Sequence, residues 1–169
     1  ALGQLIQRTD SLGGTVKLSY NSKRRLVSLI DQRGNTTSFT YDELGHRTGV
    51  RDPLGRLATA EYDAVGNITS IKDQLGRSSS FTYDALNRPS TATYADAVVT
   101  YGYDAAGKLT HINDTQDGSI DWTYDEADRV TAETTSAGTV HYAYNTASQR
   151  SSMTAADRQP VTYAYDTAG

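Results

Sequence analysis

The chain has 169 residues, of which 37% are hydrophobic, and its mean hydropathy is -0.58, a composition that disfavours a large dry core. It contains no cysteine, which excludes disulfides and thiolate chemistry, and no stretch approaches the roughly twenty apolar residues of a transmembrane helix. The net charge of -4, the pI near 5.3 and the lack of a basic cluster beyond residues 23–25 argue against nucleic acid as a partner.

A tyrosine followed by Asp or Asn recurs along the whole chain. Successive tyrosines of this motif are 20 or 21 residues apart, which indicates one supersecondary unit copied as an array. The eight copies begin at Tyr20, Tyr41, Tyr62, Tyr83, Tyr103, Tyr124, Tyr144 and Tyr165. An array repeats like residues and does not gather unlike ones, so the period favours a structural role over chemistry.

Each tyrosine precedes a four-residue turn, and a second turn of the same form lies about half a period away. The first offset turn is Asp10–Gly13, and a tyrosine turn of the full form is Asp42–Gly45. Asp at the first position accepts hydrogen bonds from the turn amides, and Gly at the fourth tolerates a left-handed backbone, which predicts a type I turn followed by a bulge. We therefore predict positive φ at Gly45, Gly66 and Gly107. Later copies replace this glycine by Asn87, Asp128 and Ser148.

The stretches of about six residues between turns have the alternation of half-buried antiparallel strands. The strands predicted ahead of the tyrosines are residues 16–20, 37–41, 79–83, 99–103, 120–124, 140–144 and 161–165. The return strands are less regular, since Leu26 and Leu29 are three apart, as are Ile68 and Ile71. Odd spacing puts such a pair on opposite faces unless a bulge intervenes, so the sequence leaves their face open.

These elements predict an all-β fold with almost no helix. Counting one strand between successive turns gives about fifteen strands in a continuous antiparallel β-meander of repeated hairpins. Open sheets beyond about ten strands usually curl, split or flatten, so we expect this one to coil into a spiral or open tube that shelters its aromatic face. A stack of independent sandwiches is the competing arrangement, but no long linker interrupts the repeat.

The segment Tyr103–Leu109 spells Tyr-Asp-x-x-Gly followed by a basic and then an aliphatic residue. In this form the chain resembles the YD-repeat (RHS-repeat) family, which includes bacterial RHS polymorphic toxins, the C component of insecticidal toxin complexes, and the teneurins. The resemblance covers residues 1–169, as about eight repeats of 20–21 residues, and it implies a fragment of a longer array. The motif residues are Tyr41, Asp42, Gly45, Tyr62, Asp63, Gly66, Tyr83, Asp84, Tyr103, Asp104, Gly107, Tyr124, Asp125, Tyr165 and Asp166.

What the resemblance implies is a long β-sheet that spirals into a hollow shell. In the toxins this shell encloses a cytotoxic C-terminal domain, and in teneurins it supports an extracellular adhesion module. The implied location is therefore secreted or at the cell surface, with any export signal outside these residues.

The residues themselves predict no catalytic, cofactor-binding or metal-binding site. His46, His111 and His141 occupy different positions of their repeats, whereas metal ligation and general-base catalysis need converging groups. The turn aspartates already have a structural role, and no nucleophile elbow, calcium loop or phosphate loop occurs. Basic side chains after the turn glycine position are expected to pair with these aspartates as a charged ladder: Arg25, His46, Arg88, Lys108 and Arg129.

An aromatic column lies two positions before the repeat tyrosines and includes Trp122. The same column holds Leu18 and Phe39, which favours a packing role for it. Exposed aromatic rings also stack on sugars, so a glycan contact at Trp122 is the alternative.

Two functions from different classes remain open at this point. The first is a non-enzymatic wall segment of a shell, whose partners are the rest of the same polypeptide and an enclosed toxin cargo. The alternative is a surface adhesion or carbohydrate-binding module. In either case an unpaired strand at each end of the array invites edge-to-edge self-association.

Overall fold

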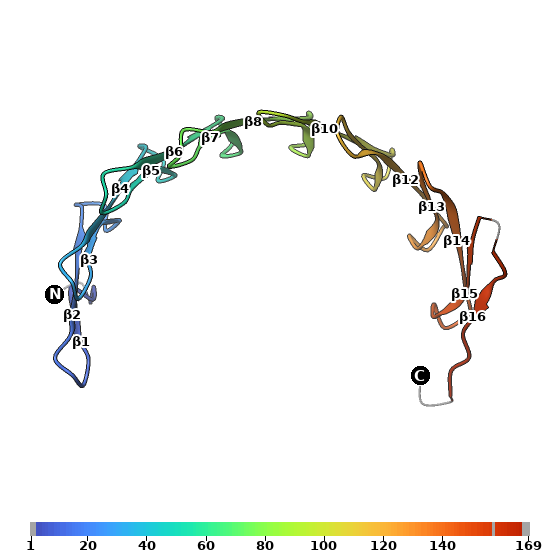
Figure 1. The fold of residues 1–169 in the computed structure, drawn as a ribbon, viewed down its shortest axis with the longest axis horizontal. Coiled ribbons are helices and arrows are strands. Elements are labelled where there is room, and N and C mark those ends of the chain that lie inside the picture. The colour runs from blue at the N-terminus through green and yellow to red at the C-terminus, as the bar shows by residue number, and fades with distance from the viewer. Residues whose placement is uncertain (1–2, 157, 167–169) are drawn as a thin grey trace. The chain divides into compact units, whose positions relative to one another are not determined.

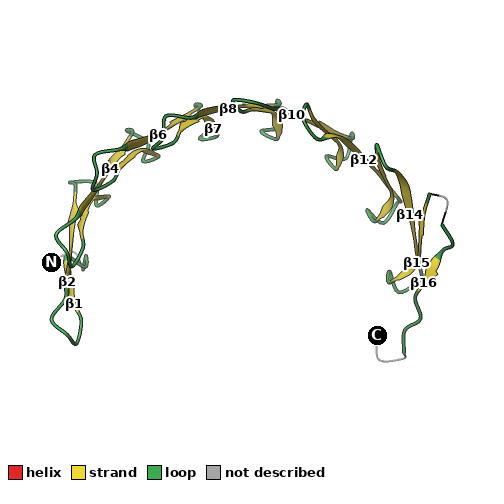
Figure 2. Cartoon of the chain, viewed as in Figure 1, coloured by secondary structure: helices red, strands yellow, loops and turns green. Residues whose placement is uncertain are grey.

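The computed structural model describes residues 3–156 and 158–166. Every regular element in this part of the chain is a β-strand (Figures 1 and 2), which confirms the prediction of an all-β fold. No helix among these residues is long and apolar enough to cross a membrane. The last turn of the final repeat, residues 167–169, lies outside the described residues.

The chain divides into two compact units, residues 1–82 and 83–169, with the division inside the eighth strand. The first eight strands are β1 (Gln7–Thr9), β2 (Thr15–Tyr20), β3 (Leu26–Ile30), β4 (Thr36–Tyr41), β5 (Arg47–Arg51), β6 (Leu57–Tyr62), β7 (Ile68–Lys72) and β8 (Ser78–Tyr83). The second eight are β9 (Pro89–Thr93), β10 (Val98–Tyr103), β11 (Leu109–Asp114), β12 (Gly118–Tyr124), β13 (Val130–Thr135), β14 (Gly138–Tyr144), β15 (Arg150–Ala155) and β16 (Val161–Thr162).

The strand order is the chain order, and neighbouring strands within each unit pair antiparallel. The meander is therefore confirmed, with sixteen described strands where the turn count predicted about fifteen. Each unit is a single layer of hairpins, not a sandwich of two sheets. The tyrosine turns lie at one end of the strands and the offset turns at the other, because successive turns of a meander alternate.

The two kinds of hairpin differ in register. In every tyrosine hairpin whose pairing is described, the register shifts beside the tyrosine, as between Ser19 and Tyr20, where Tyr20 pairs with Leu26 and Ser19 with Ser28. The offset hairpins keep a regular register, as between β3 and β4. A repeated bulge on the return strand therefore distinguishes the tyrosine end of the strands from the offset end.

The bulge determines on which face of the sheet the aliphatic residues of the return strands lie. Leu26 pairs with Tyr20 and Leu29 pairs with Leu18, and the two partners are alternate residues of β2. Leu26 and Leu29 therefore lie on the same face of the sheet as the tyrosine. Ile68 and Ile71 follow the same rule, since they pair with Tyr62 and Ala60.

No large side chain in the described residues is fully buried, and the only buried hydrophobic residues there are Ala92 and Ala132. The repeat tyrosines from Tyr20 to Tyr144 are half-buried. A single layer has no second surface to cover it, so backbone pairing and partly buried rings must hold the array together. This agrees with the prediction that no large dry core forms.

Candidate functional site

The repeated feature that gathers most of the polar contacts is the tyrosine hairpin. Backbone hydrogen bonds close its turn. In the turn that follows Tyr83, Asn87 N donates to Asp84 O (3.0 Å) and Asp84 N donates to Arg88 O (2.9 Å). The Asp84 carboxylate caps the same turn, because its Oδ1 accepts from Leu86 N (2.8 Å) and Arg88 N (3.0 Å). Aspartate thus satisfies amides that the turn leaves without a backbone partner.

The fourth turn position has positive φ, as predicted. The angles are 107° at Gly45, 93° at Gly66 and 89° at Gly107. The non-glycine replacements adopt the same region, with φ of 59° at Asn87 and about 60° at the others: Arg24, Asp128 and Ser148. Arg24 was not anticipated, because its turn begins with Asn21 and lacks the usual spelling.

Gly107→Val is expected to lower the free energy of unfolding by at least about 1 kcal/mol, because a β-branched residue is strained at this φ. Steric collision is not the reason, since a Cβ at this position would lie 3.4 Å from the nearest atom, Arg88 Nη1. Urea unfolding measures the effect. Gly107→Asn is the matched control and should cost less, because Asn87 occupies the equivalent position. Equal losses for Val and Asn would contradict the backbone explanation.

The tyrosine hydroxyls join consecutive hairpins. Tyr124 Oη donates to Leu109 O (2.6 Å), and Tyr41 Oη donates to Leu26 O (2.8 Å). The same bond, to a carbonyl 14 or 15 residues earlier, is made by Tyr20, Tyr62, Tyr103, Tyr144 and Tyr165. Tyr83 also has an interaction partner.

The accepting carbonyl lies where the ladder between consecutive hairpins ends. β11 and β12 pair as far as His111 and Asp121, and Leu109 is two residues beyond that last pair. β3 and β4 pair as far as Ser28 and Ser38, and Leu26 is again two residues beyond. The tyrosine hydroxyl therefore supplies a hydrogen bond to a main-chain carbonyl that lies beyond the last residue pair between the two hairpins.

The predicted ladder of basic residues and turn aspartates forms in four of the five hairpins. Arg88 Nη2 lies 2.6 Å from Asp84 Oδ2, and Arg129 Nη2 lies 2.7 Å from Asp125 Oδ2. His46 and Lys108 also contact the aspartates of their own turns, Asp42 at 2.8 Å and Asp104 at 3.6 Å. The prediction is wrong for Arg25, because its turn begins with Asn21 and therefore offers no carboxylate.

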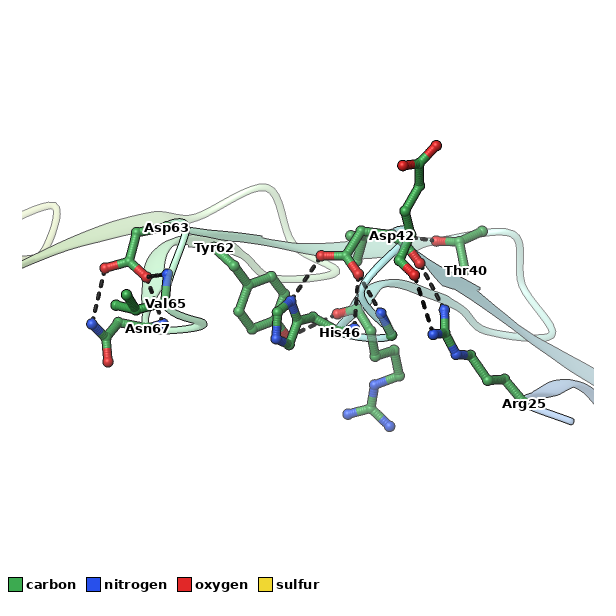
Figure 3. A network of polar contacts seen from close by, with 12 residues as sticks. Arg25, Thr40, Asp42, His46, Tyr62, Asp63, Val65 and Asn67 are labelled. Carbon is green, nitrogen blue, oxygen red and sulfur yellow. Dashed lines mark hydrogen bonds and ion pairs between the residues drawn. The ribbon is translucent and has the colours of Figure 1, made fainter. Parts of the chain in front are cut away.

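Arg25 instead binds the next turn. Its Nη1 donates to Asp42 O (2.7 Å), while Gly45 N donates to Asp42 Oδ1 (2.6 Å). Figure 3 shows Asp42 between Arg25 and His46, with Tyr62 beside the imidazole. This arrangement couples one turn to the next through a backbone carbonyl.

The same basic side chains also stack on the tyrosine of the following hairpin, which the sequence analysis did not anticipate. Arg88 lies 4.2 Å from the centroid of the Tyr103 ring, and Arg129 lies 4.7 Å from that of Tyr144. The His46 ring stacks on Tyr62 with centroids 4.7 Å apart. These are cation–π and stacking distances, so each basic side chain joins its own aspartate to the next tyrosine. A constant 15 or 16 residues between cation and tyrosine is the signal that could have revealed it.

The turn carboxylates are more acidic than free aspartate. The side-chain hydrogen bond from the arginine four residues later is the largest cause of the lowered pKa of Asp73, Asp84 and Asp125. At Asp42 and Asp52 burial is the largest single cause and raises the pKa, but hydrogen bonds together lower it. Hydrogen bonds and nearby positive charges favour the ionised carboxylate, which explains why the pKa of these aspartates is lowered.

Trp122 lies in the aromatic column, half-buried, and its Nε1 donates to Glu133 Oε2 (3.1 Å) on the neighbouring strand. Its neighbour in the column, Tyr142, has the Arg150 guanidinium 4.5 Å from its ring. These are cross-strand packing contacts. No geometry here tests a glycan contact, which stays a prediction.

Chemically, the described side chains form rows of like groups. His111 contacts Asp121 on the neighbouring strand (2.6 Å), whereas His46 contacts Asp42 in its own turn, so two of the three histidines have separate carboxylate partners. Within residues 3–156 and 158–166, no group of three or more His, Asp or Glu side chains could hold a metal ion. Three surface depressions of the first unit lie between neighbouring turns or strands.

Tyrosine hairpins joined in this way define a repeat protein built from a β-meander. The model of the RHS repeat matches residues 25–57, 62–99, 103–140 and 124–160, which is more than half of the chain. The chain therefore belongs to the RHS-repeat family. Among curated protein sequences, none matches this chain.

Solved structures with the same fold come from Tc toxins. A Photorhabdus luminescens Tc holotoxin pore carrying a substitution in TccC3 has 14% identity and a TM-score of 0.69, over 83% of this chain and 9% of that one. TcdB2–TccC3 without its hypervariable C-terminal region has 18% identity and a TM-score of 0.71, over 89% and 9%. The chain thus spans about 9% of the length of these structures, and identities this low show the fold alone.

Proposed function

We propose that this chain is a wall segment of an RHS-repeat shell that encloses a toxin or effector domain, and that it is not an enzyme. Its partners are the remainder of the polypeptide that carries the array and the enclosed cargo. We propose further that this polypeptide acts outside the cell that makes it, as a secreted or cell-surface protein.

The observation that carries the proposal is the hydroxyl bond from seven of the repeat tyrosines to the preceding hairpin, as from Tyr124 to Leu109 O and from Tyr144 to Val130 O (2.8 Å). A contact repeated about every 20 residues holds hairpins side by side over any length of array, which is what a wall requires. Membership of the RHS-repeat family and the fold shared with TccC3-containing structures support the same role.

The rows of like residues also support a non-enzymatic role. Catalysis needs a few unlike groups converging on one pocket, whereas four of the tyrosine hairpins repeat one aspartate, one basic side chain and one tyrosine. Those three groups already bond to one another, as Asp125, Arg129 and Tyr144 do. Their contacts give each a structural role.

Enclosure is tested by limited proteolysis of the complete polypeptide that carries this array. We expect a domain that follows the array to resist protease while the array is intact, and to become cleavable in a Tyr124→Ala, Tyr144→Ala variant that removes two inter-hairpin bonds. Equal cleavage rates in the intact and the variant protein would reject enclosure.

The adhesion alternative is tested on the isolated chain. Binding of a defined glycan that Trp122→Ala abolishes and that Tyr142→Ala leaves intact would favour the carbohydrate-binding module. We expect no such binding, because Trp122 already packs on its neighbouring strand through Glu133.

A further inference from the structure

The aromatic column has one gap, in β6. Two positions before the repeat tyrosine, seven of the eight repeats carry an aromatic ring or a leucine: Leu18, Phe39, Phe81, Tyr101, Trp122, Tyr142 and Tyr163. The repeat of Tyr62 has Ala60 at this position, and Ala58 lies two residues before it on the same face of the strand. On that face β6 therefore carries only methyl groups where the other repeats carry a large side chain.

A depression of about 320 Å³ lies over these alanines. Val50 of β5 lines one side of it, and Ile68 and Ile71 of β7 line the other. The register puts these side chains on the tyrosine face, since Val50 pairs with Ala58 and Ile71 pairs with Ala60. The volume is at the lower end of the range for ligand pockets, so this Ala60 depression can take one ring system and no large ligand.

The other repeats show what chemistry this position accommodates. Phe39 occupies it in β4 and pairs with Val50, and Tyr142 occupies it in β14 and pairs with Met153. In both cases an amino-acid side chain with an aromatic ring lies against an aliphatic side chain of the return strand. The Ala60 depression offers the same aliphatic surroundings, and Ile68 and Ile71 remain 37% exposed there. An aromatic side chain from another polypeptide would cover this surface and remove it from water.

The lining of the depression carries a net positive charge. Its charged residues are Arg47, Lys72 and Asp73, and the Asp73 carboxylate already lies 2.6 Å from Arg77 Nε. The Arg47 guanidinium lies 6.0 Å from the centroid of the Phe39 ring, and among the described residues no carboxylate forms an ion pair with it. A carboxylate beside the bound ring would thus meet an arginine that has no competing ion pair.

We propose that the Ala60 depression binds an aromatic side chain of a polypeptide partner, and that Arg47 binds a carboxylate adjacent to that ring. The recognised unit is Phe, Tyr or Trp next to Asp or Glu in an accessible segment of the partner. The ring fills the gap in the aromatic column, while the carboxylate makes the site selective for an acidic segment. This binding role is additional to the wall role and does not depend on it.

Binding of a short peptide to the full chain tests the proposal. The probe is acetyl-Gly-Phe-Asp-Gly-amide, added to isotopically labelled chain and followed through the amide chemical shifts. We expect saturable shifts in β5 to β7 and none in β12 to β15. The matched peptide acetyl-Gly-Phe-Asn-Gly-amide should bind at least about fivefold more weakly, because it lacks the charge that Arg47 recognises. Equal affinity for the two peptides would overturn the proposal.

Ala60→Phe fills the depression from within the chain and should weaken binding of the acidic peptide at least about tenfold. Its urea midpoint should be unchanged or higher, because Phe39 and Phe81 show that the column accepts this ring. Ala106→Phe is the control: it adds the same ring at an exposed turn position of the second unit and should leave binding unchanged. Undiminished binding to Ala60→Phe would overturn the proposal.

Arg47→Gln tests the carboxylate contact without altering the alanines. Arg47 is exposed, and the variant should bind the Asp and Asn peptides with equal affinity. A preference for the Asp peptide that survives this substitution would overturn the role of Arg47.

Other occupants give different results in the same measurement. Binding of 3-phenylpropionate as tight as that of the peptide would identify a free aromatic acid as the ligand. Shifts in β5 to β7 that grow with the concentration of the chain alone would identify a second copy. Either result would overturn the assignment to a polypeptide partner. Protease protection of a domain that follows the array is independent of all these outcomes.

Discussion

Tyr124→Ala should lower the free energy of unfolding by about 2–4 kcal/mol, and Tyr124→Phe by about 1 kcal/mol. The alanine variant loses a half-buried ring, its contact with Lys108 Nζ 5.6 Å from the ring centroid, and the hydroxyl bond to Leu109 O. The phenylalanine variant loses only the hydroxyl bond, and leaves the carbonyl of Leu109 without that donor.

The loss of stability in the Tyr124→Ala variant should be localised as well as large. Each hairpin of a repeat protein depends on its nearest neighbours, so removing one connection uncouples the hairpins on either side of it. Native-state hydrogen exchange is the suitable measurement, because an array of hairpins need not unfold in a single step. We expect amides of β11 to β14 to lose protection first and those of β2 to β5 to be unaffected.

Tyr142→Phe is the matched control for the hydroxyl. Tyr142 is a half-buried tyrosine two positions before a repeat tyrosine, and its hydroxyl has no hydrogen bond to any described residue. This substitution should therefore be nearly silent. Similar losses for Tyr124→Phe and Tyr142→Phe would mean that the bond to Leu109 does not hold the hairpins together.

The turns could be predicted because their chemistry is local. An aspartate that caps its own turn and a glycine at positive φ need only four residues, so Asp104 and Gly107 revealed the hairpin without any tertiary information. The period then fixed the meander, because successive turns leave room for one strand each.

The return strands and the stacked cations could not be predicted, because they depend on contacts between hairpins. The sequence could not place Leu26 and Leu29 on one face, since the bulge that achieves this is a feature of the pairing with β2. It also could not show that Arg25 would bind the Asp42 carbonyl, because that bond joins two turns. Composition alone predicted that no dry core forms, but not which contact replaces it.

Acid should destabilise the array cooperatively. The pKa is lowered at nine described aspartates: Asp10, Asp31, Asp42, Asp52, Asp63, Asp73, Asp84, Asp104 and Asp125. A carboxyl whose pKa is lower in the folded state contributes stability that is fully present above its unfolded pKa, near 3.8, and is lost as the pH falls through the folded pKa. We therefore expect these groups to leave the urea midpoint of the chain constant between about pH 7 and 5. Below about pH 4 their protonation should lower that midpoint steeply.

The chain contains its own neutral version of the turn, which provides the control. Asn145 and Gln149 replace the aspartate and the cation, and Asn145 Nδ2 donates to Gln149 Oε1 (2.8 Å) while Asn145 Oδ1 accepts from Gln149 N (3.0 Å). The double variant Asp125→Asn, Arg129→Gln should therefore fold and should lose part of the acid sensitivity, because its amide pair does not titrate. A variant as acid-sensitive as the unmodified chain would show that protonation of the turn aspartates does not cause acid unfolding, and that the carboxylates cap the turns without stabilising the array.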